Sequence, residues 1–193
     1  MDHPFYSPWY EWPLNAKPMW YYSSTYYPDG YRETIAAFGN PAVWWAGLAA
    51  ILAVAFFWLK GAAGRLRASR VKDHRPAIIL IAFFAQYLPW MLVPRGTYIY
   101  HYFPSVPFII LSIMLCFEYA LNYAERKKAV GPETAVSPAG KGASLIRWIY
   151  AMLLIYVLIC LVLFIAFYPY ASGVMTPVAW LRRMQWFSGW LYY

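Results

Sequence analysis

The chain has 193 residues, of which 62% are hydrophobic and 22% aromatic, while only 12% are charged. This composition lies outside the range of ordinary soluble domains and predicts an integral membrane protein. The net charge of +8 could indicate nucleic-acid binding. The basic residues, however, fall in short clusters between apolar runs, a pattern that membrane orientation explains and that argues against a nucleic-acid partner.

The first forty residues are polar, aromatic and rich in proline. Their start, MDHPFYSPWYEWPLNAKPMWYY, lacks the basic and then apolar pattern of a signal peptide. We predict that residues 1–40 form a non-cytoplasmic aromatic tail that lies ordered along the headgroup plane of the membrane. Its rings would be half-buried there, with Lys17 near lipid phosphate.

Four later stretches are long and apolar enough to cross a bilayer core about 30 Å thick. Three of them begin at a proline, which suits the first turn of a helix. The sequence therefore predicts an all-α fold, a multispanning membrane protein with four transmembrane helices and aromatic-rich outer tails. The predicted transmembrane domain is residues 41–168, with spans at about 41–59, 76–93, 104–123 and 147–168, and the second non-cytoplasmic tail is residues 169–193.

The positions of the basic residues predict how the chain is oriented. Eleven of the sixteen Lys and Arg lie between the first and second spans or between the third and fourth. By the positive-inside rule these two loops are cytoplasmic, so both termini face the other side of the cell membrane. The loop at 129–144 is rich in Gly, Pro, Ala and Ser, and we predict a flexible linker there.

Inside the spans, the polar residues and cysteines indicate packing more than chemistry. Cys116 and Cys160 lie in apolar segments without metal-ligand spacing, and the sequence indicates neither a metal nor a cofactor. We expect Gln86 to satisfy backbone groups freed by Pro89, and Glu118 to reach the membrane interface as a structural residue. A small transporter is a weaker hypothesis, because no span carries the paired charges or broken helix of a midplane site.

The short connection between the second and third spans contains the strongest candidate site. Pro94 and Gly96 should end one helix and Pro104 should begin the next, which leaves Arg95 and His101 at headgroup height. One interpretation is that both are interfacial anchors, the arginine snorkelling and the histidine bonded to a neighbouring group. The other interpretation is a site for a lipid phosphate, which would accept hydrogen bonds from the arginine and histidine side chains. Lys17 could then add a second positive charge.

The sequence around this connection, YLPWMLVPRGTYIYHYFPSVPF, resembles the C-terminal four-helix membrane region of the bacterial protein O-mannosyltransferases. Similar patterns appear, in the same order, at SPWYEWPLNAKPMWYY, at GNPAVWW and at FYPYASG, so that the resemblance covers nearly the whole chain. It implies a GT-C type glycosyltransferase that moves mannose from a polyprenyl-phosphate carrier to Ser or Thr hydroxyls at the outer face. With such a carrier, Arg95 and His101 would bind the phosphate, and Tyr98, Tyr100 and Tyr102 would contact its isoprene units or its sugar.

In that family an Asp-Glu pair in the first outer loop, far N-terminal to this region, supplies the catalytic carboxylate. That loop is missing here, and no residue is assigned a catalytic role, because the outer acids do not form the pair: Asp2, Glu11, Asp29 and Glu33. We therefore expect a truncated or separately encoded C-terminal region that is inactive alone. Its partners would be membrane lipid, polyprenyl-phosphate-mannose and a separately encoded N-terminal mannosyltransferase part. The alternative is a non-catalytic membrane scaffold or regulatory subunit.

Overall fold

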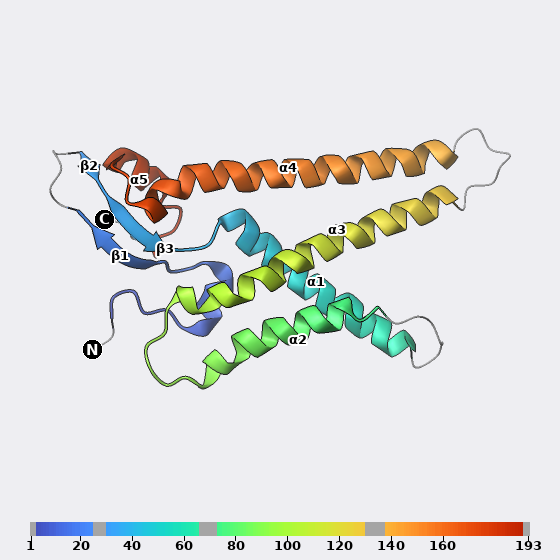
Figure 1. The fold of residues 1–193 in the computed structure, drawn as a ribbon, viewed down its shortest axis with the longest axis horizontal. Helices are drawn as coiled ribbons and strands as arrows, with labels where there is room; N and C mark the ends of the chain where they lie inside the picture. Colours follow the sequence, from blue (N-terminus) through green and yellow to red (C-terminus); the bar gives the residue numbers. More distant parts are fainter. Residues whose placement is uncertain (1–2, 25–29, 66–72, 130–137, 191–193) are drawn as a thin grey trace.

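The computed structural model describes residues 3–24, 30–65, 73–129 and 138–190, and long helices dominate it (Figure 1). The four long helices are α1 (Pro41–Arg65), α2 (Arg75–Tyr87), α3 (Val106–Ala129) and α4 (Pro138–Ser172). Short 3-10 helices extend α2 and precede α3: η2 (Leu88–Leu92) and η3 (Ile99–Ser105). The remaining elements are η1 (Trp9–Leu14), β1 (Met19–Ser23), β2 (Tyr31–Arg32), β3 (Thr34–Ala37), β4 (Thr176–Pro177) and α5 (Val178–Met184).

Four helical stretches of the described chain are long and apolar enough to cross a membrane, which confirms the four predicted spans. They are Pro41–Gly61, Arg75–Leu92, Ile99–Lys128 and Gly142–Ser172. The largest difference from the prediction is in the last helix, which begins before residue 147 and continues past Pro169 to Ser172. Hydropathy marks only the apolar part of a helix, whereas backbone hydrogen bonding continues into its polar ends.

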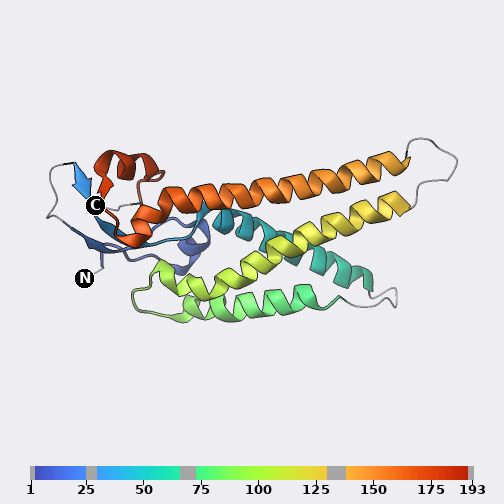
Figure 2. The ribbon, with the colours of Figure 1, turned by 45° about the horizontal axis from the view of Figure 1, so that its top comes forward.

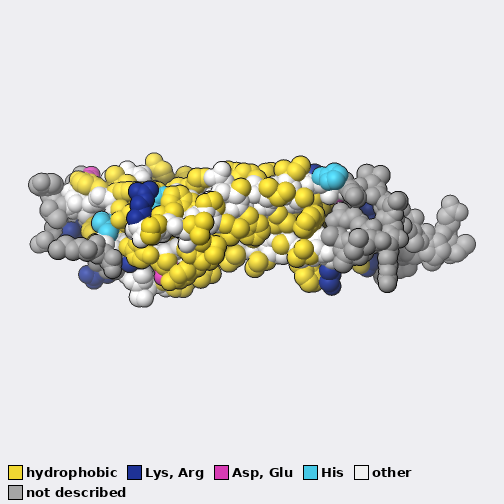
Figure 3. Space-filling model, turned by 90° about the horizontal axis from the view of Figure 1, so that it is seen from below, with side chains coloured by type: hydrophobic (Ala, Val, Ile, Leu, Met, Phe, Trp, Pro, Cys, Tyr) yellow, Lys and Arg dark blue, Asp and Glu magenta, His cyan; other side chains and the backbone are white. Residues whose placement is uncertain are grey.

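The helices form an elongated molecule whose two ends differ (Figures 1 and 2). The first and last described residues, the strands and α5 lie together at one end, here called the tail end, together with the connection from α2 to α3. At the other end, here called the loop end, α1 and α3 finish and α2 and α4 begin. In the space-filling view, apolar side chains cover the middle of the molecule, and basic side chains appear towards the ends (Figure 3). This distribution suits a bundle that is surrounded by lipid.

Helix α3 is the central helix of the bundle and packs against α1, α2 and α4. Gly47 of α1 faces the side chain of Ile109 in α3 so closely that a Cβ added to the glycine would lie 2.7 Å from it. Small residues of this kind allow the backbones of membrane helices to approach each other. Ile109 is fully buried and belongs to the main apolar core between these helices.

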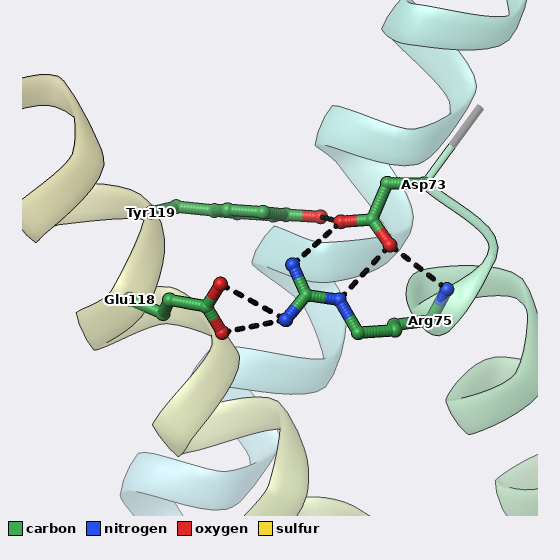
Figure 4. Close-up of polar contacts among 4 residues, drawn as sticks. All are labelled: Asp73, Arg75, Glu118 and Tyr119. Atoms are coloured by element: carbon green, nitrogen blue, oxygen red, sulfur yellow. Dashed lines mark hydrogen bonds and ion pairs between the residues drawn. The ribbon is translucent and has the colours of Figure 1, made fainter. Parts of the chain in front are cut away.

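At the loop end, an ion-pair cluster joins the start of α2 to α3 (Figure 4). The Arg75 guanidinium donates to Glu118 at 2.7 and 2.9 Å and to the two oxygens of Asp73 at 2.9 and 3.0 Å. The hydroxyl of Tyr119 donates to Asp73 at 3.0 Å. Glu118 therefore has the structural role that was predicted. The prediction for Gln86 was wrong, because its exposed side chain forms no hydrogen bond with the described residues.

At the tail end, the structure contains two small antiparallel sheets that the all-α prediction did not include. β1 pairs with β3 from Met19 opposite Ala37 to Ser23 opposite Thr34, with an irregularity at Trp20/Tyr22. β2 pairs with β4, which follows α4. A second apolar cluster packs β3, with Trp20 of β1, against α4 and α5, and its buried members are Ala36, Phe167, Tyr170, Leu181, Met184 and Trp190. Both tails are therefore folded onto the ends of the helices.

Candidate functional site

The connection that carries Arg95 is held in place by the N-terminal tail. The backbone N–H of Ser7 donates to the carbonyl of Thr97 at 3.0 Å, and the hydroxyl of Thr97 donates to the carbonyl of Ser7 at 2.9 Å. Both residues are buried, at 0% and 4% exposure. This two-bond link between residues 90 positions apart fixes the backbone two residues after Arg95. We call residues 93–98 the Arg95 turn.

Trp12 of η1 connects this link to the helices. Its fully buried indole N–H lies 3.0 Å from the carbonyl oxygen and 3.1 Å from the hydroxyl oxygen of Ser7. The carbonyl of Trp12 accepts a hydrogen bond from the indole of Trp44 in α1 at 2.9 Å. Nearby, the hydroxyl of Tyr87 in α2 donates to the carbonyl of Trp9 at 3.0 Å. The tail is therefore tied to both of the first two membrane-crossing helices.

His101 lies in a cluster of aromatic rings that includes Trp12. Its ring centroid is 4.0 Å from that of Trp90 and 4.3 Å from that of Tyr100, and it stacks at 5.8 Å on Trp12. Its Nδ1 lies 3.1 Å from the backbone nitrogen and 2.9 Å from the carbonyl oxygen of Tyr98. When Nδ1 accepts from the N–H of Tyr98, the neutral ring carries its hydrogen on Nε2, which has no hydrogen-bond partner among the described residues and can donate to a ligand.

Arg95 is exposed, and among the described residues its guanidinium has no hydrogen-bond or ion-pair partner. It lies six residues before His101 in the same connection. Both residues belong to the connection between α2 and α3, and their joint role as a phosphate site stays a prediction. An unpaired guanidinium presents several donors in a planar fork that matches a phosphate group.

The three candidate tyrosines differ in their surroundings. Tyr98 and Tyr100 stack on each other with centroids 5.6 Å apart, and Tyr100 is 36% exposed. Tyr21 of β1 stacks on Tyr100 at 6.4 Å, and burial, together with the neighbouring Tyr100, raises the pKa of Tyr21. Tyr102 is only 1% exposed and packs in the core beside Tyr87. Packing accounts for Tyr102, so only the two other tyrosines remain in the candidate site.

Lys17 lies between η1 and β1 and is partly buried. No hydrogen bond or ion pair with the described residues connects it to the Arg95 turn. Its predicted contribution of a second positive charge therefore has no support in the contacts of the tail end and stays a prediction.

Sequence reasoning missed the residues that support the site. Ser7, Trp12, Thr97 and Trp90 looked like interfacial belt or loop residues. Nothing in a single sequence indicates that residue 7 pairs with residue 97, since the pairing follows from how the tail folds back over the helix ends. The density of tryptophans in the tail was the available signal, because a buried indole N–H requires a hydrogen-bond partner.

An apolar groove runs along the first two helices and approaches the Arg95 turn. It has a volume of about 740 Å³ and is lined by α1, α2 and η2. Its walls include Trp58, Leu59, Leu80, Leu88, Pro89 and Leu92. Leu92 is the last residue of η2 and lies three positions before Arg95, so the groove extends along η2 towards the Arg95 turn. Its apolar walls suit a hydrocarbon chain rather than a polar ligand.

The described part of the tail end offers little acid–base chemistry. Asp2 and Asp29 lie outside the described residues, and the described acids are Glu11 and Glu33, both partly buried. Among the described residues, no three His, Cys, Asp or Glu side chains are placed to hold a metal ion. The arrangement can bind an anionic group and an apolar chain, but its described residues do not present a catalytic carboxylate pair.

Four membrane-crossing helices, capped by a folded aromatic tail end, define the class of this chain as a region of a multi-pass membrane protein. Residues 1–190 match the family described as the C-terminal four-transmembrane region of protein O-mannosyltransferase. The chain belongs to this family, as the sequence resemblance indicated.

Curated relatives agree with this assignment. The polyprenol-phosphate-mannose–protein mannosyltransferase of Corynebacterium glutamicum is 28% identical over 195 residues, which cover 98% of this chain and 32% of that protein. The dolichyl-phosphate-mannose–protein mannosyltransferase 1 of Saccharomyces cerevisiae is 24% identical, over 94% of this chain and 20% of that protein. The chain thus spans a third or less of the length of these relatives.

A solved structure shows the same fold. The S. cerevisiae protein O-mannosyltransferase Pmt1-Pmt2 complex bound to the sugar donor contains a chain that matches with a TM-score of 0.71. The match covers all of this chain and 24% of that chain, at 22% identity. The arrangement of four spans and a folded tail end therefore recurs in an experimentally determined member of the family.

Proposed function

We propose that this region forms the carrier side of a protein O-mannosyltransferase, binding the phosphate of a polyprenyl-phosphate-mannose donor at the Arg95 turn. Arg95 provides the guanidinium fork, and His101 adds a hydrogen bond from Nε2. The catalytic carboxylate comes from a part of the enzyme outside this region, in the same or a partner polypeptide. The mannose is transferred to Ser or Thr hydroxyls of an acceptor protein.

The observation that carries this proposal is the guanidinium of Arg95, which has no partner among the described residues and lies three residues beyond an apolar groove of about 740 Å³. A polyprenyl phosphate needs both features, because its chain is hydrocarbon and its headgroup is anionic. At the membrane interface, a charge-assisted hydrogen bond to the phosphate is worth about 1.5–3 kcal/mol. Tyr98 and Tyr100 then face the sugar or the first isoprene units.

We further propose that the tail end faces the outside of the cell membrane and the loop end faces the cytoplasm. The excess of Lys and Arg in the two loops supports this orientation. It places the phosphate site at the outer interface, where proteins that leave the cell would meet it.

Photo-crosslinking with a polyprenyl-phosphate probe tests the proposal in membranes that contain the full-length protein. Arg95→Ala should weaken probe binding about tenfold or more, because one bond of about 1.5–3 kcal/mol is lost and about 1.4 kcal/mol corresponds to a factor of ten. Arg95→Lys should restore only part of the affinity, since an ammonium lacks the planar fork.

Arg183→Ala is the matched control, because Arg183 is an exposed arginine of α5 at the same end of the molecule. It should label like the wild type. If the Arg95→Ala/His101→Ala double variant also labels like the wild type, both residues are interfacial anchors and the region acts as a scaffold.

A further inference from the structure

The N-terminal tail has a role that its aromatic composition does not indicate. We propose that Thr97 and Trp12 are positioning residues of the phosphate site, through which the tail holds Arg95 and His101 in their binding geometry. This inference rests on the proposed function, because it concerns the same site. It makes residues 7–12 part of the donor site, although none of them is required to touch the donor.

The first step of the argument concerns the backbone around Arg95. Pro94 precedes it and fixes its own φ angle, whereas Gly96 follows it and leaves the chain free to adopt many conformations. Thr97 is the next residue, and its two hydrogen bonds with Ser7 end this freedom. Without them, a glycine would separate Arg95 from the nearest fixed point in η3.

The second step concerns the orientation of His101. Its ring is enclosed by Trp90, Tyr100 and Trp12, and Trp12 is itself fixed by its hydrogen bonds to Ser7. The carbonyl of Ser7 therefore accepts from both Thr97 and Trp12. One carbonyl thus connects the support of the Arg95 backbone to the support of the His101 ring.

The third step concerns what holds the tail itself. Hydrogen bonds from Trp44 of α1 and Tyr87 of α2 reach the carbonyls of Trp12 and Trp9. The support of the site is thus built on two membrane-crossing helices. A site whose side chains are held before binding loses less conformational entropy when the ligand binds. Positioning should therefore raise affinity without adding a contact to the phosphate.

A double-mutant cycle tests this proposal with the polyprenyl-phosphate probe in the full-length protein. Thr97→Val keeps the shape of the side chain but removes the hydroxyl donor, and it should weaken binding about fivefold. That factor corresponds to about 1 kcal/mol at about 1.4 kcal/mol per factor of ten. Thr97→Ser keeps the donor and should bind like the wild type. In the Arg95→Ala background, Thr97→Val should have no further effect, because it acts through Arg95.

Thr176→Val is the matched control. Thr176 is 5% exposed, lies at the same end and donates its hydroxyl to the carbonyl of Val174 at 2.7 Å. It should leave probe binding unchanged. Trp12→Phe, which removes the indole N–H, is a second variant in case Thr97→Val does not fold, and it should lose its effect in the His101→Ala background, because it acts through the His101 ring.

A spin label at position 95, introduced as Arg95→Cys, gives a measurement without ligand. Its mobility should increase with Thr97→Val and stay unchanged with Thr176→Val. An unchanged mobility, or an additive effect of Arg95→Ala and Thr97→Val, would overturn the positioning role while leaving the proposed function intact. If Arg95→Ala alone does not affect probe binding, the proposed function and this inference both fail.

Discussion

The carboxamide of Asn15 uses both of its polar atoms on one partner. Its Nδ2 donates to the carbonyl of Gly39 at 2.8 Å and its Oδ1 accepts from the N–H of Gly39 at 3.1 Å. Its backbone has a positive φ of 55°, which Asn tolerates better than most residues, and its carbonyl accepts from the indole of Trp190 at 2.7 Å. A single residue therefore joins η1, the start of α1 and the C-terminal segment.

Replacing Asn15 by Ala should lower the free energy of unfolding by about 2–4 kcal/mol. The change removes two buried hydrogen bonds, leaves polar groups of Gly39 unpaired and adds strain at a positive φ. Denaturant unfolding in detergent micelles, followed by tryptophan fluorescence, measures the loss. Asn15→Gly relieves the strain at the positive φ but does not restore the two hydrogen bonds. Its free energy of unfolding should therefore lie between those of the wild type and Asn15→Ala. Wild-type stability in Asn15→Ala would contradict the role of this residue.

Arg75 and Arg95 differ in their partners, and this difference distinguishes a structural arginine from a candidate binding residue. Arg75 is paired with two carboxylates, so its donors are occupied. Arg95 has no such partner among the described residues and follows, by three positions, the last residue that lines the apolar groove. Exposed ion pairs contribute little to stability, so the free donors of Arg95 are the feature on which the proposed anionic ligand depends.

At the scale of elements, the membrane-crossing helices could be predicted from the sequence and the strands could not. Each span needs only a long apolar run, which is local information. β1 and β3 pair antiparallel across a short connection, but β2 pairs with β4, which follows α4 at residue 176. For the candidate site, Arg95 and His101 stay a prediction, whereas Tyr102, which the sequence grouped with Tyr98 and Tyr100 as a carrier contact, is buried at 1% exposure. Whether a ring faces the core or the ligand depends on how η3 packs on α2.

The contact between α2 and α3 at the loop end should depend on pH in a defined direction. Hydrogen bonds from Arg75 lower the pKa of Asp73 from 3.8 to about 2. A carboxyl whose pKa is lower in the folded state stabilises the fold above its unfolded pKa, and this contribution is lost as the pH falls from about 4 to about 2. The side chains of Arg75 and Asp73 are 52% and 35% exposed. Solvent screening therefore limits the contribution of their ion pair to the free energy of unfolding to about 1 kcal/mol or less.

Unfolding measured between about pH 7 and pH 2 checks this direction. Wild type and Asp73→Asn should show the same slope from about pH 7 to pH 5, and below about pH 4 only the wild type should lose the contribution of this carboxylate. Glu125→Gln, at an exposed carboxylate near the end of α3, is the control and should follow the wild type. Identical acid profiles for wild type and Asp73→Asn would show that the cluster does not favour the ionised carboxylate.

At the scale of the whole molecule, the two ends differ in construction. Four spans return the chain to the side on which it began, so the strands, α5 and the Arg95 turn all meet at the tail end (Figures 1 and 2). That end is a folded cap, built from both tails: one buried indole hydrogen bond joins the tails to each other, and another fixes the cap to α1. The proposed phosphate site lies within this cap. Its function therefore depends on which side of the membrane the cap faces.

Cysteine labelling in intact cells tests this orientation. After Cys116 and Cys160 are replaced by Ser, single cysteines at exposed positions of the tail end, Tyr10→Cys and Ser188→Cys, should react with a membrane-impermeant maleimide. Cysteines at the loop end, His74→Cys and Lys128→Cys, should react only after the cells are permeabilised. These two positions should be protected because they adjoin the loops rich in Lys and Arg, and loops of that composition are retained in the cytoplasm. Labelling of His74→Cys or Lys128→Cys from outside would reverse the orientation and would place the Arg95 turn at the cytoplasmic interface.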